Sequence, residues 1–388
     1  MLPRRILTAD VVYSGIGTPR RNGAVVIQGE GQDAQVIAID HLAAATANHP
    51  DAPVEEAGFA ISPPLVNAHT HLDLSDMPQF RGDYEAFITA VIAHTKAGKR
   101  GLGAAKRGVD ELLAAGIGTI GDIVADEEVM EYLLKHPKLT GVAYWEVISL
   151  RDDQAEERFE QALGELRRFR RWERPGGMKL GLSLHTPHTV SPQLMQKLAR
   201  LAQESRLPLQ MHVAETAGEV ELHSSGGGPL KALLANLGCD WRPSGLSPVQ
   251  YLSRLGVLEA RPTLVHMVHV SEEDIRLVQK AGCTVVHCPR SNEGLGCGRF
   301  PWELYARQGA EVAFGTDSRG SAPDLSIEAE VGHAAALHGE RASSLALVRS
   351  AVKGGCRALG VEPPKVMRGD PASKLHIWPP LRELGRVH

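Results

Sequence analysis

Residues 61–76 read ISPPLVNAHTHLDLSD, and the architecture expected for the rest of the chain follows from this stretch. A short apolar run leads to two histidines at alternate positions, His69 and His71. Alternate side chains of a strand share one face, so both imidazoles would leave one strand end together and can hold a divalent ion. A His-x-His pair alone most often binds nothing, so the prediction depends on whether the chain supplies further ligands.

Composition narrows the class of protein. The chain has 388 residues, of which 43% are hydrophobic and 23% charged, as in a folded protein of one large or two ordinary domains. A net charge of −4 without a basic block argues against a nucleic-acid binder, and 5% aromatic residues argue against a stacking platform for single strands. No run of 18 apolar residues predicts a membrane span, and the first 15 residues resemble a strand more than a signal peptide.

Cysteines and histidines give two further indications. The five cysteines are scattered and form no CxxC pair, which argues against a disulfide framework and favours a reducing cytoplasm. By contrast, 17 histidines are many for this length, and several follow apolar runs. A buried histidine needs a hydrogen-bond partner or a metal, so this distribution indicates a site.

The order of apolar runs predicts the fold. Residues 4–40 show short alternating strands with turns between them, and residues 41–58 are expected to form a loop with about one helical turn. From residue 64 on, apolar runs alternate with helical patterns. Eight strands are predicted: 64–68, 117–121, 141–148, 179–184, 208–213, 262–266, 283–287 and 311–315. Eight β/α units over this length predict a TIM-type (β/α)8 barrel. A doubly wound open sheet is the alternative, but the glycine-rich phosphate motif after its first strand is missing.

The domain organisation follows from the same reading. Residues 61–349 are expected to form the catalytic barrel, with an insertion over its mouth at 216–260. Residues 374–379, KLHIWP, resemble a strand that returns to the N-terminal sheet. Residues 1–60 and 350–388 are therefore predicted to form a small β-sandwich from both chain ends.

Metal-capable side chains stand where the predicted strands end, which is where active sites of such barrels are built. These residues are His69, His71, His185, His212 with Glu215, His266 with His269, His287 with Cys288, and Asp317. Each of them could be a bonded rim residue, but the whole set at successive strand ends indicates a metal site.

Six motifs in this order resemble the amidohydrolase superfamily, and more narrowly its cytosolic deaminase and chlorohydrolase branch. They are PPLVNAHTHLDLS, HTPHTVS, HVAET, LVHMVHVSEEDI, HCPRSN and GTDS, and the resemblance runs over nearly the whole chain. The resemblance implies a metal-bearing barrel with a small β domain. It also implies four metal ligands, which are His69, His71, His212 and Asp317.

Three imidazoles and one carboxylate suit a single Zn²⁺, with Fe²⁺ or Mn²⁺ also possible, and leave room for a water whose pKa the ion lowers. The resemblance implies that Asp317 accepts the proton of this water and that Glu215 protonates a ring nitrogen. His266 would hydrogen-bond the attacking hydroxyl and the tetrahedral intermediate.

Other positions are assigned more weakly. His185, Asp73 and Glu146 are candidate substrate contacts beside Glu215, although a bonded rim residue or a salt-bridged carboxylate is an open alternative for each. A structural or supporting role is expected for His188, His269, His287 and Cys288, and Ser291, Asn292 and Ser318 are expected to order the loops beside Asp317. No lysine is placed to bridge two metals, and the HxE…PCxxC signature of the unrelated zinc deaminases is absent.

The expected function is hydrolytic deamination of an amino-substituted purine nucleoside or related heterocycle. Within the branch, the HTHLDLS and HCPRSN patterns are most similar to deaminases of aminodeoxyfutalosine in menaquinone biosynthesis. Deaminases of S-adenosylhomocysteine, methylthioadenosine or nucleobases are the first alternative, and a triazine chlorohydrolase or cyclic-amide hydrolase is the second. A non-catalytic barrel scaffold is the third, although it would be expected to have lost ligands. The expected partner is a small molecule, with no nucleic acid and no membrane, and a homo-oligomer is possible.

Overall fold

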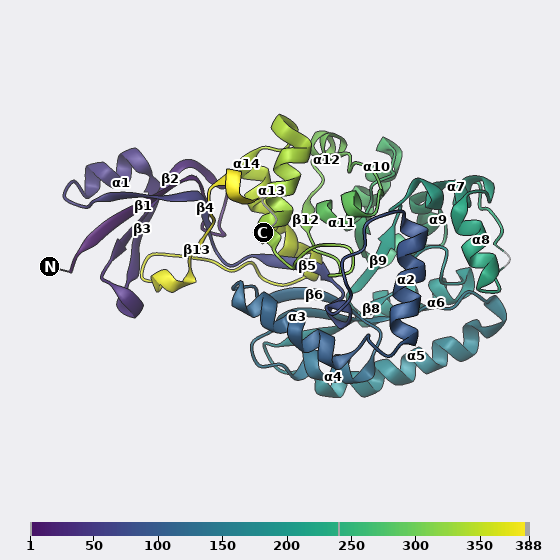
Figure 1. The fold of residues 1–388 in the computed structure, drawn as a ribbon. Coiled ribbons are helices and arrows are strands. Elements are labelled where there is room, and N and C mark those ends of the chain that lie inside the picture. Colours follow the sequence, from purple (N-terminus) through teal and green to yellow (C-terminus); the bar gives the residue numbers. More distant parts are fainter. Residues whose placement is uncertain (1, 240, 385–388) are drawn as a thin grey trace.

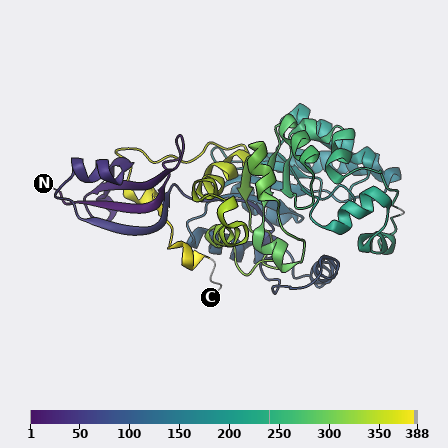
Figure 2. The ribbon, with the colours of Figure 1, turned by 90° about the horizontal axis from the view of Figure 1, so that it is seen from above.

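Two sheets of different kinds organise the computed structural model, which describes residues 2–239 and 241–384. Figure 1 shows the N-terminal sheet, in purple, beside a much larger barrel, and the last segment, in yellow, returning to that sheet. Both views show the two parts side by side along the long axis of the molecule (Figures 1 and 2). None of the helices in the described ranges is long and apolar enough to cross a membrane.

The small sheet contains both chain ends, as the sequence predicts. Its strand order is β13-β4-β1-β2-β3, and only β1 and β4 run parallel to each other. The sheet is apolar on both faces: α1 (Leu42–Asn48) covers one, and the C-terminal segment around Val366 packs on the other. The strands are β1 (Arg4–Val12), β2 (Arg20–Gln28), β3 (Gln35–His41), β4 (Val54–Ser62) and β13 (His376–Ile377).

The prediction of a loop with about one helical turn at residues 41–58 is wrong, because this stretch contains α1 and the first half of β4. The N-terminal half of β4 is acidic and exposed, whereas its C-terminal half, from Phe59, is buried between β1 and β13. The strand therefore shows no period-two alternation, which is the pattern that predicts strands. Its pairing with β1 and β13, over 40 and over 300 residues away, overrides the weak local signal.

Eight parallel strands form the barrel, which confirms the predicted fold class. Neighbours in the sheet follow chain order from β5 to β12, and a bridge between Thr70 and Asp317 joins the first strand to the end of the last. The backbone N–H groups of Thr316 and Asp317 both donate to the carbonyl of His69 at 3.1 Å. The strands are β5 (Val66–Thr70), β6 (Thr119–Val124), β7 (Thr140–Glu146), β8 (Met178–Ser183), β9 (Leu209–Val213), β10 (Thr263–His266), β11 (Thr284–His287) and β12 (Val312–Phe314).

Amphipathic helices cover the barrel because each presents an apolar stripe at helical spacing. In α6 (Pro192–Ser205), for example, Leu194 and Leu198 are fully buried, and each such side chain contributes about 1.5–3 kcal/mol to folding. The other helices of this ring include α3 (Leu102–Ala114), α4 (Glu127–Lys135), α5 (Ala155–Phe169), α9 (Pro248–Arg254), α10 (Glu272–Ala281), α12 (Trp302–Gln308), α13 (Ile327–His338) and α14 (Ser344–Arg349).

The last barrel helices continue past residue 350. A π-helical turn (Ser350–Gly354) and α15 (Gly355–Leu359) pack against β12 and β5. A Cβ on Gly354 would lie 2.3 Å from the carbonyl oxygen of Val312, and one on Gly355 would lie 2.6 Å from the Cβ of Val66. Two glycines are needed here because the helix backbone touches the barrel strands directly. The return to the small sheet therefore begins after Leu359.

Three further helices lie at the end of the barrel where the strands point. The region 216–260 contains α7 (Ala217–Ser225) and α8 (Pro229–Asn236) before α9 joins the outer ring. A helix that the sequence reading did not identify, α2 (Tyr84–Lys96), lies against α8. Figure 1 shows α2, α7 and α8 at the end of the molecule opposite to the small sheet.

Candidate metal centre and active site

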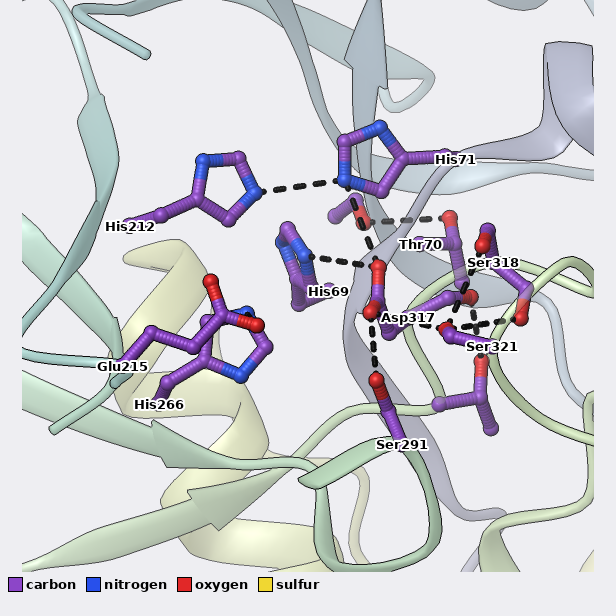
Figure 3. A network of polar contacts seen from close by, with 12 residues as sticks. His69, Thr70, His71, His212, Glu215, His266, Ser291, Asp317, Ser318 and Ser321 are labelled. Atoms are coloured by element: carbon purple, nitrogen blue, oxygen red, sulfur yellow. Dashed lines mark hydrogen bonds and ion pairs between the residues drawn. The ribbon is translucent and has the colours of Figure 1, made fainter. Parts of the chain in front are cut away.

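The four predicted ligands converge at the carboxyl ends of the barrel strands (Figure 3). His69 and His71 come from the end of β5, His212 from β9, and Asp317 from the residues after β12. Nε2 of His69 lies 3.6 Å and Nε2 of His71 3.4 Å from Oδ1 of Asp317, while the Nε2 atoms of His71 and His212 are 3.2 Å apart. The alternation of side chains on a strand explains why His69 and His71 reach the same site.

The hydrogen bonds of two histidines leave their inward nitrogens free for a cation. Nδ1 of His69 donates to the amide oxygen of Gln210 at 2.7 Å, and Nδ1 of His212 donates to the carbonyl of His185 at 3.0 Å. Each ring therefore presents the lone pair of Nε2 to the site. Nε2 of His69 is buried and has no hydrogen-bond partner among the described residues, and the lone pair of His212 lies 3.2 Å from Nε2 of His71. The donor set fits a divalent metal ion of the zinc class.

Asp317 is held by one of its two carboxylate oxygens. Oδ2 accepts hydrogen bonds from Ser291 at 2.7 Å and from Ser321 at 2.9 Å, and Oδ1 therefore stays directed at His69 and His71. Burial opposes ionisation, but the adjacent imidazoles of His69 and His71 hold the pKa of Asp317 well below its usual range. The carboxylate is thus ionised and free to bind a cation or accept a proton.

The backbone around the site is locally strained. Four residues other than glycine adopt positive φ angles at or just beyond the ends of strands β9, β10 and β12, namely Ala214, His266, Met267 and Asp317. Such conformations cost on the order of 1–3 kcal/mol each and cluster where side chains must be aimed at a site. Gly315 lets the backbone after β12 approach His69 closely, because a Cβ at this position would lie 2.7 Å from the Cβ of His69.

Glu215 and His266 form the second part of the site. Oε1 of Glu215 lies 3.6 Å from Nε2 of His266, and both side chains are buried. Nδ1 of His266 donates to the amide oxygen of Asn292 at 2.8 Å, so neutral His266 presents Nε2 as an acceptor. Burial and the charge of Asp317 raise the pKa of Glu215 to about 8. A carboxylic acid that keeps its proton at neutral pH can donate it to a substrate.

The two parts share one cavity of about 390 Å³. Its floor is polar and consists of the strand-end residues His71, His185, His212, Glu215, His266 and Asp317. Its roof is apolar and comes from α2 and from α8 with the residue after it: Phe87, Ile88, Val91, Ile92, Leu230, Leu233, Leu234 and Leu237. The cavity therefore combines a polar, histidine-rich floor with an apolar chamber above it.

The candidate substrate contacts differ in position. His185 lines the cavity, and its Nδ1 lies 2.6 Å from the hydroxyl of Thr189 in its own loop. It can therefore be a bonded rim residue and a substrate contact at the same time. Glu146 also lines the cavity. Asp73 does not line it: its carboxylate is fully buried and accepts a hydrogen bond from Nε of Arg100 at 2.7 Å. Arg100 lines the cavity in its place.

Several residues expected to have supporting roles contact other parts of the fold. His269 donates to the carbonyl of Cys297 at 2.6 Å, and His287 lies with Nε2 3.3 Å from that of His338. Cys288 is buried, and burial raises its pKa well above the usual range for a thiol. Ser318 bonds Ser321 at 3.2 Å rather than the carboxylate itself.

Sequence reasoning missed several residues that build the site. Gln210 orients His69, and Asn67 accepts from the backbone N–H of Thr316 at 3.2 Å. Asp122 accepts from Thr70 and from the backbone of Leu72, beside the two histidines of β5. A signal was present, because each of the three is a polar residue inside an otherwise apolar strand run.

A fourth missed residue, Tyr84, begins α2 and lines the cavity. Burial and the negative charge of Glu215 raise its pKa well above the usual range for a phenol.

The chain is similar in sequence to known proteins of one enzyme family. The sequence profile described as "Amidohydrolase family" matches residues 60–365. The chain is 44% identical over 390 aligned positions, covering 98% of it and 91% of the relative, to the aminodeoxyfutalosine deaminase of Deinococcus radiodurans.

Two solved structures share the fold. Aminofutalosine deaminase of Helicobacter pylori, in complex with methylthio-coformycin, superposes with a TM-score of 0.73 at 21% identity, over 95% of this chain and 90% of that one. A zinc-bound adenosine deaminase of Xanthomonas campestris superposes with a TM-score of 0.67 at 24% identity, over 95% and 83%.

Proposed function

The chain belongs to the amidohydrolase family, and we propose that it is a metal-dependent deaminase whose substrate is aminodeoxyfutalosine. The observation that carries the proposal is the convergence of His69, His71, His212 and Asp317 beside a buried acid, Glu215. The chain is 44% identical, over nearly its whole length, to a relative named aminodeoxyfutalosine deaminase, and this identity supports the choice of substrate. The reaction would replace the amino group of the purine ring by oxygen and release ammonia, as a step of menaquinone biosynthesis.

The four ligands would hold one Zn²⁺, the ion named for the Xanthomonas relative of this fold. Fe²⁺ or Mn²⁺ would satisfy the same three imidazoles and one carboxylate. When bound, such an ion supplies a nucleophile at neutral pH by lowering the pKa of water.

The chain's own residues would then move the protons. Oδ1 of Asp317, the oxygen left free by Ser291 and Ser321, would accept a proton from the attacking water and pass it to the departing amine. Glu215 would give its proton to the ring nitrogen next to the attacked carbon and so neutralise the charge that builds there. Nε2 of His266, an acceptor because Nδ1 donates to Asn292, would hydrogen-bond the attacking hydroxyl and hold it in line.

The apolar roof would receive the rest of the nucleoside. Side chains of α2 and α8 enclose the chamber above the floor, so an extended, largely apolar substituent on the ribose would be buried there. Arg100, Glu146 and His185 would meet the polar groups between the purine and this substituent.

Ammonia release over a panel of substrates tests the proposal. The panel contains aminodeoxyfutalosine, adenosine, methylthioadenosine, S-adenosylhomocysteine, guanine, cytosine and a chlorotriazine. The kcat/KM for aminodeoxyfutalosine is expected to be the highest. Faster release from methylthioadenosine or S-adenosylhomocysteine would keep the deaminase and change the substrate. Chloride release from the triazine, with no ammonia from any aminated compound, would contradict deamination.

A cytoplasmic location and a homo-oligomeric state stay predictions. The first rests on the odd number and scatter of the five cysteines in the sequence. Fractionation of the native cells tests the location, and light scattering of the purified chain tests the oligomeric state.

A further inference from the structure

A second group of metal-capable side chains lies beside the cavity but outside the centre described above. His188 belongs to the loop between β8 and α6, and Glu219 and His223 belong to α7. All three are buried, with 5%, 3% and 0% of their surface exposed. Possible ligand atoms of the three lie within 4.8 Å of one another, as they do in His69, His71 and His212.

The polar atoms of this cluster lack partners. Nδ1 of His188, Oε1 of Glu219 and both ring nitrogens of His223 are buried and make no hydrogen bond within the described part of the chain. Buried polar atoms are almost always bonded, and leaving one unsatisfied costs about 1–3 kcal/mol. Four such atoms in three adjoining side chains indicate a bound species that satisfies several of them together.

The surroundings hold the three side chains in place. Glu219 and His223 are four residues apart on α7, and therefore lie on one face of the helix. Oε2 of Glu219 accepts from the backbone N–H of Glu215 at 2.9 Å, which leaves Oε1 for another partner. The ring of His223 packs against Trp241, at 4.8 Å between centroids, and against Tyr251, at 5.0 Å. These contacts thus fix the directions of Glu219 and His223 on α7.

We propose that His188, Glu219 and His223 bind a second divalent cation of the zinc class. Two imidazole nitrogens and one carboxylate oxygen are a donor set that Zn²⁺ takes with a fourth position left for water. His188 also lines the cavity, so the fourth position is expected on the substrate side.

This second ion has a structural consequence for the active site. α7 follows directly after Glu215, and His188 stands three residues after His185. A cation shared by the two segments ties the loop that carries a substrate contact to the helix that follows the acid. Its effect is therefore expected on substrate binding, and the His69, His71, His212 and Asp317 centre keeps its own ion.

Metal analysis of the purified holoprotein tests this inference. We expect two equivalents of zinc per chain by mass spectrometry, and two peaks in an anomalous difference map recorded at the zinc edge. His223→Phe keeps a ring against Trp241 and Tyr251, and Glu219→Gln keeps an acceptor for the N–H of Glu215. Each variant is expected to hold one equivalent, whereas the control His136→Phe, at a partly exposed position, is expected to hold two.

Several outcomes overturn the proposal. One is a single equivalent in the wild-type chain, with its only anomalous peak at His69 and His71. Another is electron density without anomalous signal between His188 and His223, which would identify a buried water instead. A third is a second equivalent that survives in both variants. Should His223→Phe fail to fold, the wild-type map and Glu219→Gln still decide.

Discussion

The floor and the roof of the cavity are built in opposite ways. The floor consists of side chains at the ends of barrel strands, which hydrogen bonds from neighbouring strands and loops fix in direction. The roof consists of apolar side chains from two helices that lie outside the β/α repeat, α2 and α8. The difference indicates that the barrel supplies the chemistry and the added helices select the substrate. Substitutions in the floor should therefore act on turnover, and substitutions in the roof on substrate choice.

The largest effect is expected from removing a metal ligand of the floor. In His212→Ala, one imidazole is lost and the facing nitrogen of His71 has no counterpart. We expect the metal content at this centre to fall and kcat to drop by at least about a thousandfold. Metal analysis and ammonia release measure both. Retained turnover in metal-depleted His212→Ala would mean that the floor does not supply the chemistry.

The next effect is expected at the acid. Glu215→Gln keeps the shape of the side chain but has no proton to give, so kcat should fall by about 10²–10⁴-fold while the metal stays bound. Loss of metal from this variant would show that Glu215 is a ligand and not the acid.

The pH profile sharpens the same prediction. The pKa of Glu215 is raised to about 8, so the residue is protonated and active below that value and loses its proton as pH rises through it. A bound cation favours the carboxylate, so the alkaline fall of kcat/KM is expected at or below pH 8. The fall should be absent in the residual activity of Glu215→Gln.

A smaller effect is expected one layer below the ligands. Gln210→Leu removes the acceptor of the His69 N–H and frees the ring to turn. Loss of such a supporting bond typically weakens metal affinity by about 10–100-fold. Competition with a zinc chelator measures the affinity, and the exposed Gln161→Leu is the control that should leave it unchanged.

The smallest effect is expected in the roof. Leu233→Ala shortens a partly buried side chain of α8 and should cost about 1 kcal/mol of binding, or roughly fivefold in kcat/KM, for a substrate with an extended substituent. Adenosine, which lacks such a substituent, should react as before, and the metal content should not change. An equal loss for both substrates would break the division between floor and roof.

The sequence predicts the floor of the cavity better than its roof. The barrel was predictable from the order of apolar runs, and the meeting of His69, His212 and Asp317 was predictable because each stands at a strand end. Their role as metal ligands came from the resemblance to the amidohydrolase superfamily and stays a prediction. The helix α2 was not predictable, since its burial depends on α8, far away in the sequence, and it carries only one buried side chain, Phe87. Asp73 was a candidate contact because it follows His71, but its partner Arg100 comes from a loop whose path the sequence does not specify.

Metal reconstitution tests the central claim most directly. The wild-type chain and His71→Ala are stripped with a chelator, reloaded with zinc, and assayed for ammonia release from aminodeoxyfutalosine. The account predicts that the stripped wild type is inactive, that zinc restores its turnover, and that zinc does not restore the variant. Ammonia release at the full rate from the stripped wild type, or equal recovery in His71→Ala, would contradict a metal-dependent deaminase at these strand ends.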